Sequence, residues 1–263
     1  MGTWDMQLRA LPGIPMISAG DDLASIVAKA LTADDQVLQD GDILVVAQKV
    51  VSKAEDLIID LDTVSAGPEA LALAEQTGRT PAYCQLVLDE SSEVVAVLGR
   101  HIITVDRRGI VDTAGGVDSG NAGRYNKQAC LLPPDPDASA QRIRKGLREL
   151  TGTAVGVIVS DSLGNPFRQG SQGTAIGLAG VAAVERPEAD EEDLSGNPMM
   201  GDINRVDELA GAAGALMGQG SEARPVVLIR GAGWTRSETA SIRQLLIPNP
   251  AGSFPLARDP QPS

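Results

Sequence analysis

Residues 154–180, AVGVIVSDSLGNPFRQGSQGTAIGLAG, bring together side chains that could do chemistry. The β-branched run over 154–159 predicts a buried strand that ends at Asp161 and Ser162. Because the carboxyl ends of strands face the ligand crevice in open α/β sheets, these two side chains are candidate ligands for Mg²⁺ or Mn²⁺. Arg168 is a candidate clamp for a phosphate or carboxylate. An alternative stays open, in which Asp161 and Ser162 only cap the next element.

Two further polar clusters carry a chemical and a structural interpretation each. Lys49 and Lys53 follow a predicted buried strand over 43–46 and could cradle an anion, or could lie on a solvated edge. Asp118 and Asn121 lie in a stretch rich in glycine and small residues, which predicts a loop free to coordinate a ligand. Asp, Gly and Asn are also common turn residues, so Asp118 and Asn121 could instead have only a structural role in a turn.

Composition excludes several classes of protein. The net charge of −13 over 263 residues argues against a nucleic-acid-binding surface. No apolar run approaches the roughly 20 residues that span a bilayer, and no secretory leader is present, so we expect a cytoplasmic protein without a membrane partner. With one histidine, His101, a Ser-His-Asp or Cys-His site is almost excluded, and Cys84 and Cys130 have no metal-binding spacing.

The familiar nucleotide signatures are also missing. Neither GxxxxGK[ST] nor GxGxxG occurs, so the P-loop and the Rossmann fingerprint are absent. What remains is an oxygen-rich, metal-binding site with a few local cations inside an acidic protein. This combination points towards phosphoryl chemistry.

Helix and strand signals alternate along the whole chain. Helices are expected after Asp22, over Pro68–Thr77, from Pro81 to about Glu90, within 131–152 and within 205–220. Strands are expected at 43–46, 93–98, 101–105, 154–159, 173–184 and 225–230, with a hairpin turn at 99–100. The acidic stretch 185–193 is interpreted as a solvated loop. We therefore expect a mixed α/β (α+β) protein, with 1–247 as one catalytic unit of two lobes and 248–263 as a Pro-rich tail.

The chain resembles a known family, the GTP-dependent coenzyme F420-0:L-glutamate ligases. The resemblance extends through about Arg230 and is carried by GIPMISAGDDL, DGDILVVAQKVVSKAED, AGGVDSGN, LLPPDPDASA, VGVIVSDSLGNPFRQGSQGTAIGLAG and DELAGAAGALMGQG followed by PVVLIRG. Each segment alone is weak. Their common order makes the resemblance specific.

The resemblance implies a nucleotide site and a metal site. The implied GTP-binding residues are Pro15, Met16, Ile17, Ser18, Gln48, Lys53, Asn121, Met217, Gly218, Gly220 and Ser221. The implied ligands of two Mg²⁺ or Mn²⁺ ions are Asp118, Asp161, Ser162 and Gln219, with K⁺ as a further candidate cation. Asp118 and Asp161, together with Arg168, are thus our candidate catalytic residues.

The implied activity is addition of L-glutamate to coenzyme F420-0, with GTP consumed and an acyl phosphate formed on the way. The product is F420-1, and a second γ-linked addition gives F420-2. The resemblance also implies a family-specific fold and a homodimer. Two alternatives stay open: a GTP- or coenzyme-binding regulator without ligase activity, and a ligase for another phosphorylated carboxylic acid.

Overall fold

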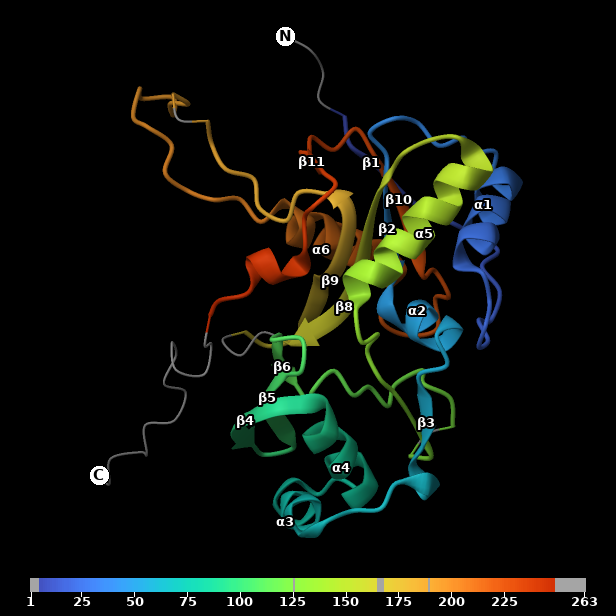
Figure 1. Cartoon of the computed structure of the whole chain (residues 1–263), viewed down its shortest axis with the longest axis vertical. Coiled ribbons are helices and arrows are strands. Elements are labelled where there is room, and N and C mark those ends of the chain that lie inside the picture. The colour runs from blue at the N-terminus through green and yellow to red at the C-terminus, as the bar shows by residue number, and fades with distance from the viewer. Residues whose placement is uncertain (1–4, 125, 165–167, 189, 249–263) are drawn as a thin grey trace.

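The chain folds into a larger and a smaller lobe, shown at the top and the bottom of Figure 1. This computed structural model describes residues 5–124, 126–164, 168–188 and 190–248. The expected mixed α/β class is confirmed, since helices cover sheets in which parallel and antiparallel pairs coexist. The predicted tail beyond residue 248 lies outside the described residues. Among the described residues, no helix combines the length and apolarity that crossing a membrane requires.

A six-stranded mixed sheet is the framework of the larger lobe. Its strand order is β1-β10-β2-β8-β9-β11, and β2 and β8 are its parallel pair. The strands are β1 (Gln7–Ala10), β10 (Val226–Arg230), β2 (Ile43–Ala47), β8 (Gly156–Gly164), β9 (Ser171–Val181) and β11 (Arg236–Ser237). The central strands are buried on both faces, which explains their continuous runs of Val, Ile and Leu.

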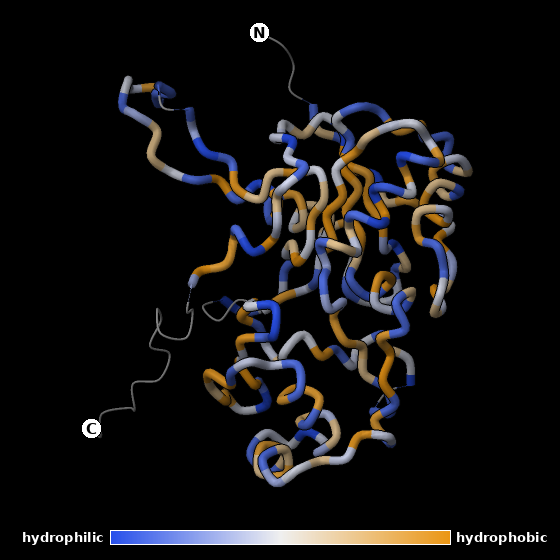
Figure 2. The backbone as a smooth tube through the Cα atoms, viewed as in Figure 1, coloured by the Kyte–Doolittle hydropathy of each residue, from blue (hydrophilic) through white to orange (hydrophobic). Residues whose placement is uncertain are grey.

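Helices cover both faces of this sheet. Leu44 and Val46 of β2 face α1 (Leu23–Ala33) and α5 (Pro136–Thr151) within one apolar cluster. Ile43 and Val45 point the other way, towards α6 (Arg205–Met217). Side chains alternate between the faces because successive Cβ atoms of a strand point to opposite sides. The hydrophobic tube segments gather between these layers in Figure 2.

The smaller lobe has its own core. Helices α3 (Pro68–Thr77) and α4 (Pro81–Glu90) pack with a three-stranded sheet of order β4-β5-β6. Its strands are β4 (Ser91–Leu98), β5 (His101–Asp106) and β6 (Val111–Thr113). A two-stranded ladder of β3 (Ile58–Asp60) and β7 (Gln128–Cys130) connects the lobes, and α2 (Gln48–Ala54), η1 (Leu61–Thr63) and η2 (Ile242–Leu245) complete the elements of the described residues.

An exposed arm leaves the larger lobe between β9 and α6. Its described residues, 185–188 and 190–203, form two antiparallel segments that are held by isolated bridges between Glu185 and Ile203 and between Glu192 and Pro198. The arm extends away from the body of the molecule in Figure 1. The expectation of a solvated acidic segment over 185–193 is confirmed at residues 190–193, which are exposed, whereas Glu185 at its start is half-buried and forms an ion pair with Arg205.

Two sequence-based expectations need correction. Strand β8 does not end at Asp161 but continues to Gly164, because its second half pairs with β9 as an antiparallel hairpin. The stretch 109–123 was expected to lack regular structure, yet it contains β6, which pairs with β5. In both places long-range pairing supplies order that local composition does not reveal.

Candidate active site

The parallel pairing of β2 with β8 creates the crevice in which the candidate residues gather. Ala47, the last residue of β2, is the register partner of Ser160. The chain then turns directly into α2, whereas β8 runs on past the end of its neighbour. Asp161 and Ser162 therefore stand beyond the carboxyl end of β2, next to the first turn of α2. The capping interpretation of these two residues is wrong, since both lie inside a strand.

We call the concavity between the end of β2 and the loop after α6 cavity A. It has a volume of about 410 Å³. Ten of the expected nucleotide-binding residues line it: Pro15, Met16, Ile17, Gln48, Lys53, Asn121, Met217, Gly218, Gly220 and Ser221. The expected metal ligands Asp161, Ser162 and Gln219 line it too. Ser18 is not among the lining residues; it is exposed, and its backbone N–H donates to Asp21.

Side-chain hydrogen bonds close cavity A over the sheet. The Asn121 amide donates to the backbone carbonyl of Gly220 at 3.1 Å, joining the loop after β6 to the loop after α6. The Ser162 hydroxyl donates to Oε1 of Gln219 at 2.7 Å. Gln48 has a more structural position: it is buried and donates to Ser52 and to the carbonyl of Leu131.

Close contact of α6 with β9 sets the position of the loop over cavity A. A Cβ on Gly173 would lie 2.4 Å from the backbone carbonyl oxygen of Ala210 and could not be accommodated without movement. Gly214 packs next to Gly173 as well, although a Cβ there would lie at an ordinary contact distance of 3.4 Å. The small residues of this helix thus let its backbone approach the sheet, and the helix ends at Gly218 next to the cavity.

A second, smaller concavity, cavity B, adjoins cavity A. Its volume is about 220 Å³, and Asp118, Asp161 and Ser162 all line it. Backbone hydrogen bonds in both directions with Cys130 fix Asp118. One carboxylate oxygen of Asp118 accepts from the N–H of Gly120, as a turn residue does, while the other forms an ion pair with Lys49. Both interpretations of Asp118 thus have a counterpart in the structure.

Burial and neighbouring charges both act on the carboxyl groups of this junction. Burial raises the pKa of the Asp161 carboxyl, and the charge of Asp118 raises it further. The N–H of Ser162 and the ammonium of Lys49 act in the opposite direction. Lys49 therefore does not lie on a solvated edge; its side chain is 27% exposed and neutralises a carboxylate of the site.

The residues at the junction suit a divalent cation of the magnesium type. Two carboxylates, a hydroxyl and an amide oxygen are all hard oxygen donors. Among the described residues, no group of three or more His, Cys, Asp and Glu side chains forms a metal cage. Mg²⁺ commonly binds through one or two carboxylates and takes its other oxygens from water and substrate phosphates. The donor set of Asp118, Asp161, Ser162 and Gln219 fits this coordination preference.

Arg168 lies in a third concavity, cavity C, and not with the two aspartates. Cavity C has a volume of about 490 Å³ and combines the apolar Leu98, Ile103 and Val111 with His101 and Arg168. Ser162 lines this cavity as well, so all three cavities meet at one hydroxyl.

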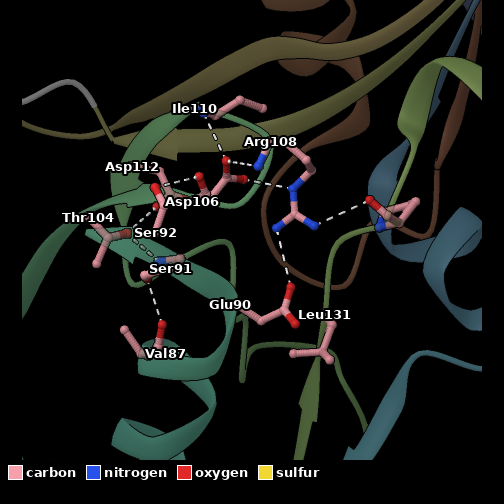
Figure 3. Close-up of polar contacts among 12 residues, drawn as sticks. Val87, Glu90, Ser91, Ser92, Thr104, Asp106, Arg108, Ile110, Asp112 and Leu131 are labelled. Carbon is pink, nitrogen blue, oxygen red and sulfur yellow. Dashed lines mark hydrogen bonds and ion pairs between the residues drawn. The ribbon is translucent and has the colours of Figure 1, made fainter. Parts of the chain in front are cut away.

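Sequence reasoning missed other residues of the site. Asp112 in β6 lines both cavity B and cavity C and is 3% exposed. The Thr104 hydroxyl donates to its Oδ1, as seen in Figure 3. Burial raises the pKa of Asp112 to about 7, and the Asp106 charge contributes. Arg79 and Tyr83 also line cavity B. The sequence carries no local signal for either role, since Arg79 lies in the turn between two predicted helices and Tyr83 in the first turn of α4.

Comparison with known proteins identifies the family. Residues 13–231 match the family described as F420-0:Gamma-glutamyl ligase. The chain is 40% identical over 254 residues to the coenzyme F420:L-glutamate ligase of Methanothermobacter thermautotrophicus, covering 95% of this chain and 98% of that protein. It is 41% identical over 222 residues to the enzyme of the same name from Methanococcus maripaludis, covering 83% and 86%. The corresponding Archaeoglobus fulgidus enzyme is 36% identical over 230 residues.

An oxygen-rich crevice in a mixed α/β fold, without a P-loop, together with these relatives defines an enzyme of the ligase class. The chain belongs to the F420-0:gamma-glutamyl ligase family. The family resemblance noted in the sequence is thereby confirmed.

Proposed function

We propose that this protein is a GTP- and divalent-metal-dependent ligase that joins L-glutamate to coenzyme F420-0. The observation that carries the proposal is the junction of cavities A and B at Asp161 and Ser162. Such a junction lets a nucleotide in one cavity and a second substrate in the other approach the same oxygen donors. The names of the relatives supply the substrates, since each is an F420:L-glutamate ligase.

Cavity A binds GTP with its phosphates towards Lys53, Lys49 and the carboxyl end of β2. An oxygen of the F420-0 lactyl carboxylate attacks the γ-phosphorus, and the bond between that phosphorus and the β–γ bridging oxygen breaks. GDP leaves, and an acyl phosphate remains. The amine of L-glutamate then attacks the acyl carbon, phosphate leaves, and the amine proton passes to solvent. Repetition at the γ-carboxylate of the new glutamate gives F420-2 from F420-1.

This scheme needs no covalent protein nucleophile, which agrees with a chain that has a single histidine. The residues of the chain act by positioning the reactants and by stabilising charge. Asp118, Asp161, Ser162 and Gln219 are the residues that would hold Mg²⁺ or Mn²⁺. When bound, the metal neutralises the phosphate charge that develops during phosphoryl transfer.

An assay with GTP, Mn²⁺, K⁺, L-glutamate and F420-0 tests the proposal. We expect GDP release coupled to a product heavier by one or two glutamyl units, detected by mass spectrometry. Asp161→Asn should abolish metal-dependent turnover, whereas Glu75→Gln on the exposed face of α3 should leave it unchanged. Nucleotide binding without GDP release would instead indicate a regulator. GDP release only with another acid would indicate a different acceptor.

The protein acts as a homodimer in this proposal. The support is the exposed arm over 185–203, whose apolar side chains Leu194 and Met200 are 109% and 90% exposed. Exposed apolar groups on a protruding segment are typical of surfaces that contact a partner. Light scattering should give the mass of a dimer for the wild type and of a monomer for the Leu194→Glu, Met200→Glu double variant. A wild-type monomer would contradict this assembly.

A further inference from the structure

Cavity B contains charged residues that nucleotide binding in cavity A leaves unused. Arg79 and Arg100 line it together with His101 from the smaller lobe. Asp112 joins them from β6, near the junction with cavity A. The cavity therefore offers cationic and anionic groups within about 220 Å³. It is smaller than the ~300–1,000 Å³ typical of pockets for drug-sized ligands, and its size suits an amino acid.

Among the residues that the structure describes, two buried polar atoms in the lining of this cavity have no hydrogen-bond partner. Asp112 Oδ2 has no hydrogen-bond partner, although the residue is 3% exposed and its other oxygen is bound to Thr104. Nε of Arg79 is also buried and unpartnered. Within the described part of the chain, neither Arg79 nor Arg100 forms an ion pair with a side chain.

Unpartnered buried charges need an explanation, because leaving such a group unsatisfied costs about 1–3 kcal/mol or more. A ligand that carries both signs of charge would satisfy the acid and the arginine together. A zwitterionic amino acid has an ammonium group for Asp112 and a carboxylate for a guanidinium. A second carboxylate would use the remaining arginine.

We propose that cavity B is the binding site of the amino-acid co-substrate, with Arg79 and Arg100 holding the two carboxylates of L-glutamate and Asp112 holding its ammonium group. The inference rests on the proposed function, which it deepens by locating the second substrate. Asp161 and Ser162 belong to both cavities, so an amine held in cavity B lies beside the place where cavity A presents the activated carboxylate.

Contacts with Tyr83 hold the Arg79 side chain in position to bind a carboxylate. Its guanidinium lies over the ring of Tyr83, 5.1 Å from the centroid. The Tyr83 hydroxyl donates to the backbone carbonyl of Val117 at 3.0 Å, one residue before Asp118. Tyr83 is therefore a positioning residue, which aligns the arginine with the loop of the metal site.

Steady-state kinetics on the full-length chain test the inference. Arg79→Gln and Arg100→Gln should each raise the KM for L-glutamate about ten- to hundredfold, since each removes a charge-assisted contact, and leave the KM for GTP within about twofold. One of the two variants, the one that lacks the arginine holding the γ-carboxylate, should also reduce the preference for L-glutamate over L-glutamine. Asp112→Asn should raise the same KM. Arg107→Gln is the matched control, because Arg107 is exposed in the same lobe and does not line the cavity.

Three results would overturn the inference while leaving the ligase activity in place. They are an unchanged glutamate KM in both arginine variants, an increase in the KM for F420-0 instead, or an equal effect in Arg107→Gln. Thermal melting identifies any variant that fails to fold. If Arg79→Gln does not fold, the glutamate KM of Arg100→Gln decides the test, because Arg100 is exposed.

If the wild type shows no ligation, the proposed function fails and calorimetry decides the cavity separately. L-glutamate is titrated into the protein with GDP and Mn²⁺ present. Binding that is lost in Arg79→Gln and kept in Arg107→Gln supports the site. Equal binding by both variants, or none by the wild type, overturns it.

Discussion

At the scale of single residues, Asp112 is the group whose charge the fold accommodates least well. Its carboxyl is buried, its Oδ2 has no partner, and the carboxylate of Asp106 is nearby. These conditions favour the neutral acid, so the folded protein holds a proton on Asp112 up to about pH 7. The unfolded chain releases that proton at an ordinary carboxyl pKa of about 3.9. Between these two values the folded state binds more protons, and its stability falls as the pH rises.

We therefore expect Asp112→Asn to stabilise the unliganded protein at pH 8 relative to the wild type, and to have little effect at pH 4. The amide keeps an oxygen for the Thr104 hydroxyl and carries no charge. The difference between the two pH values should be on the order of 2–4 kcal/mol, from a pKa shift of about three units. Urea unfolding across this pH range measures it. Asp62→Asn, at an exposed side chain, is the control, and parallel pH profiles for both variants would contradict the argument.

At the scale of elements, the contact between α6 and β9 controls the site from a distance. Gly173 lets the backbone of α6 approach the sheet at Ala210. The same helix ends at Gly218, and the loop that follows supplies Gln219 to Ser162. A change of the spacing between helix and strand would therefore move Gln219, which lines cavity A.

Gly173→Ala should cost about 1–3 kcal/mol of stability, as overpacking of a close contact does, and should raise the KM for GTP. The new methyl group would meet the carbonyl of Ala210, which belongs to the backbone and has little freedom to move. Chemical denaturation and nucleotide titration measure the two effects. Gly201→Ala, where a Cβ would meet nothing within 4 Å, should change neither. Equal behaviour of both variants would show that the contact does not matter.

The sequence predicted helices well where residues that start or end a helix lie next to it in the chain. Pro68, Gly78 and the Thr80-Pro81 pair bound α3 and α4, and the structure places both helices at the expected residues. Strand β6 was missed because three residues, Val111–Thr113, carry too short a pattern and are ordered only by pairing with β5. The extent of β8 was misjudged for the same reason, since pairing with β9 carries it past Asp161.

Part of the candidate site could likewise be predicted from local sequence, whereas the rest depends on tertiary packing. Asp118 and Asp161 stand out by residue type and by their neighbours, and the structure brings them to one cavity. Arg79 could not be found from the sequence, because its part in cavity B depends on how the smaller lobe packs against the β8–β9 hairpin. Arg168 lies apart from the two aspartates, in cavity C, which spacing along the chain did not reveal.

At the scale of the whole molecule, Arg108 connects the two lobes. Its side chain is 8% exposed and donates to Asp106 at 2.7 Å. A second nitrogen donates to Glu90 at the end of α4, as Figure 3 shows. The third donates to the backbone carbonyl of Pro133, in the segment that leads into α5. The turn between β5 and β6 is thereby attached to the larger lobe.

Arg108→Met should destabilise the protein by about 3 kcal/mol, because the buried carboxylate of Asp106 loses its cationic partner. The loss should appear first as faster amide hydrogen exchange in β5 and β6, since these strands carry the broken contact. Arg107→Met changes the neighbouring exposed arginine and should have no such effect. Uniform acceleration over both lobes in Arg108→Met would contradict a local connecting role.

The meeting of three cavities at the Ser162 hydroxyl has a thermodynamic consequence. A molecule seated in any one of them becomes part of the wall of the next, so the affinities cannot be independent. Linkage then requires reciprocity: whatever factor the nucleotide imposes on glutamate affinity, glutamate imposes on the nucleotide. Ligands added singly should accordingly bind with different constants from the same ligands added together.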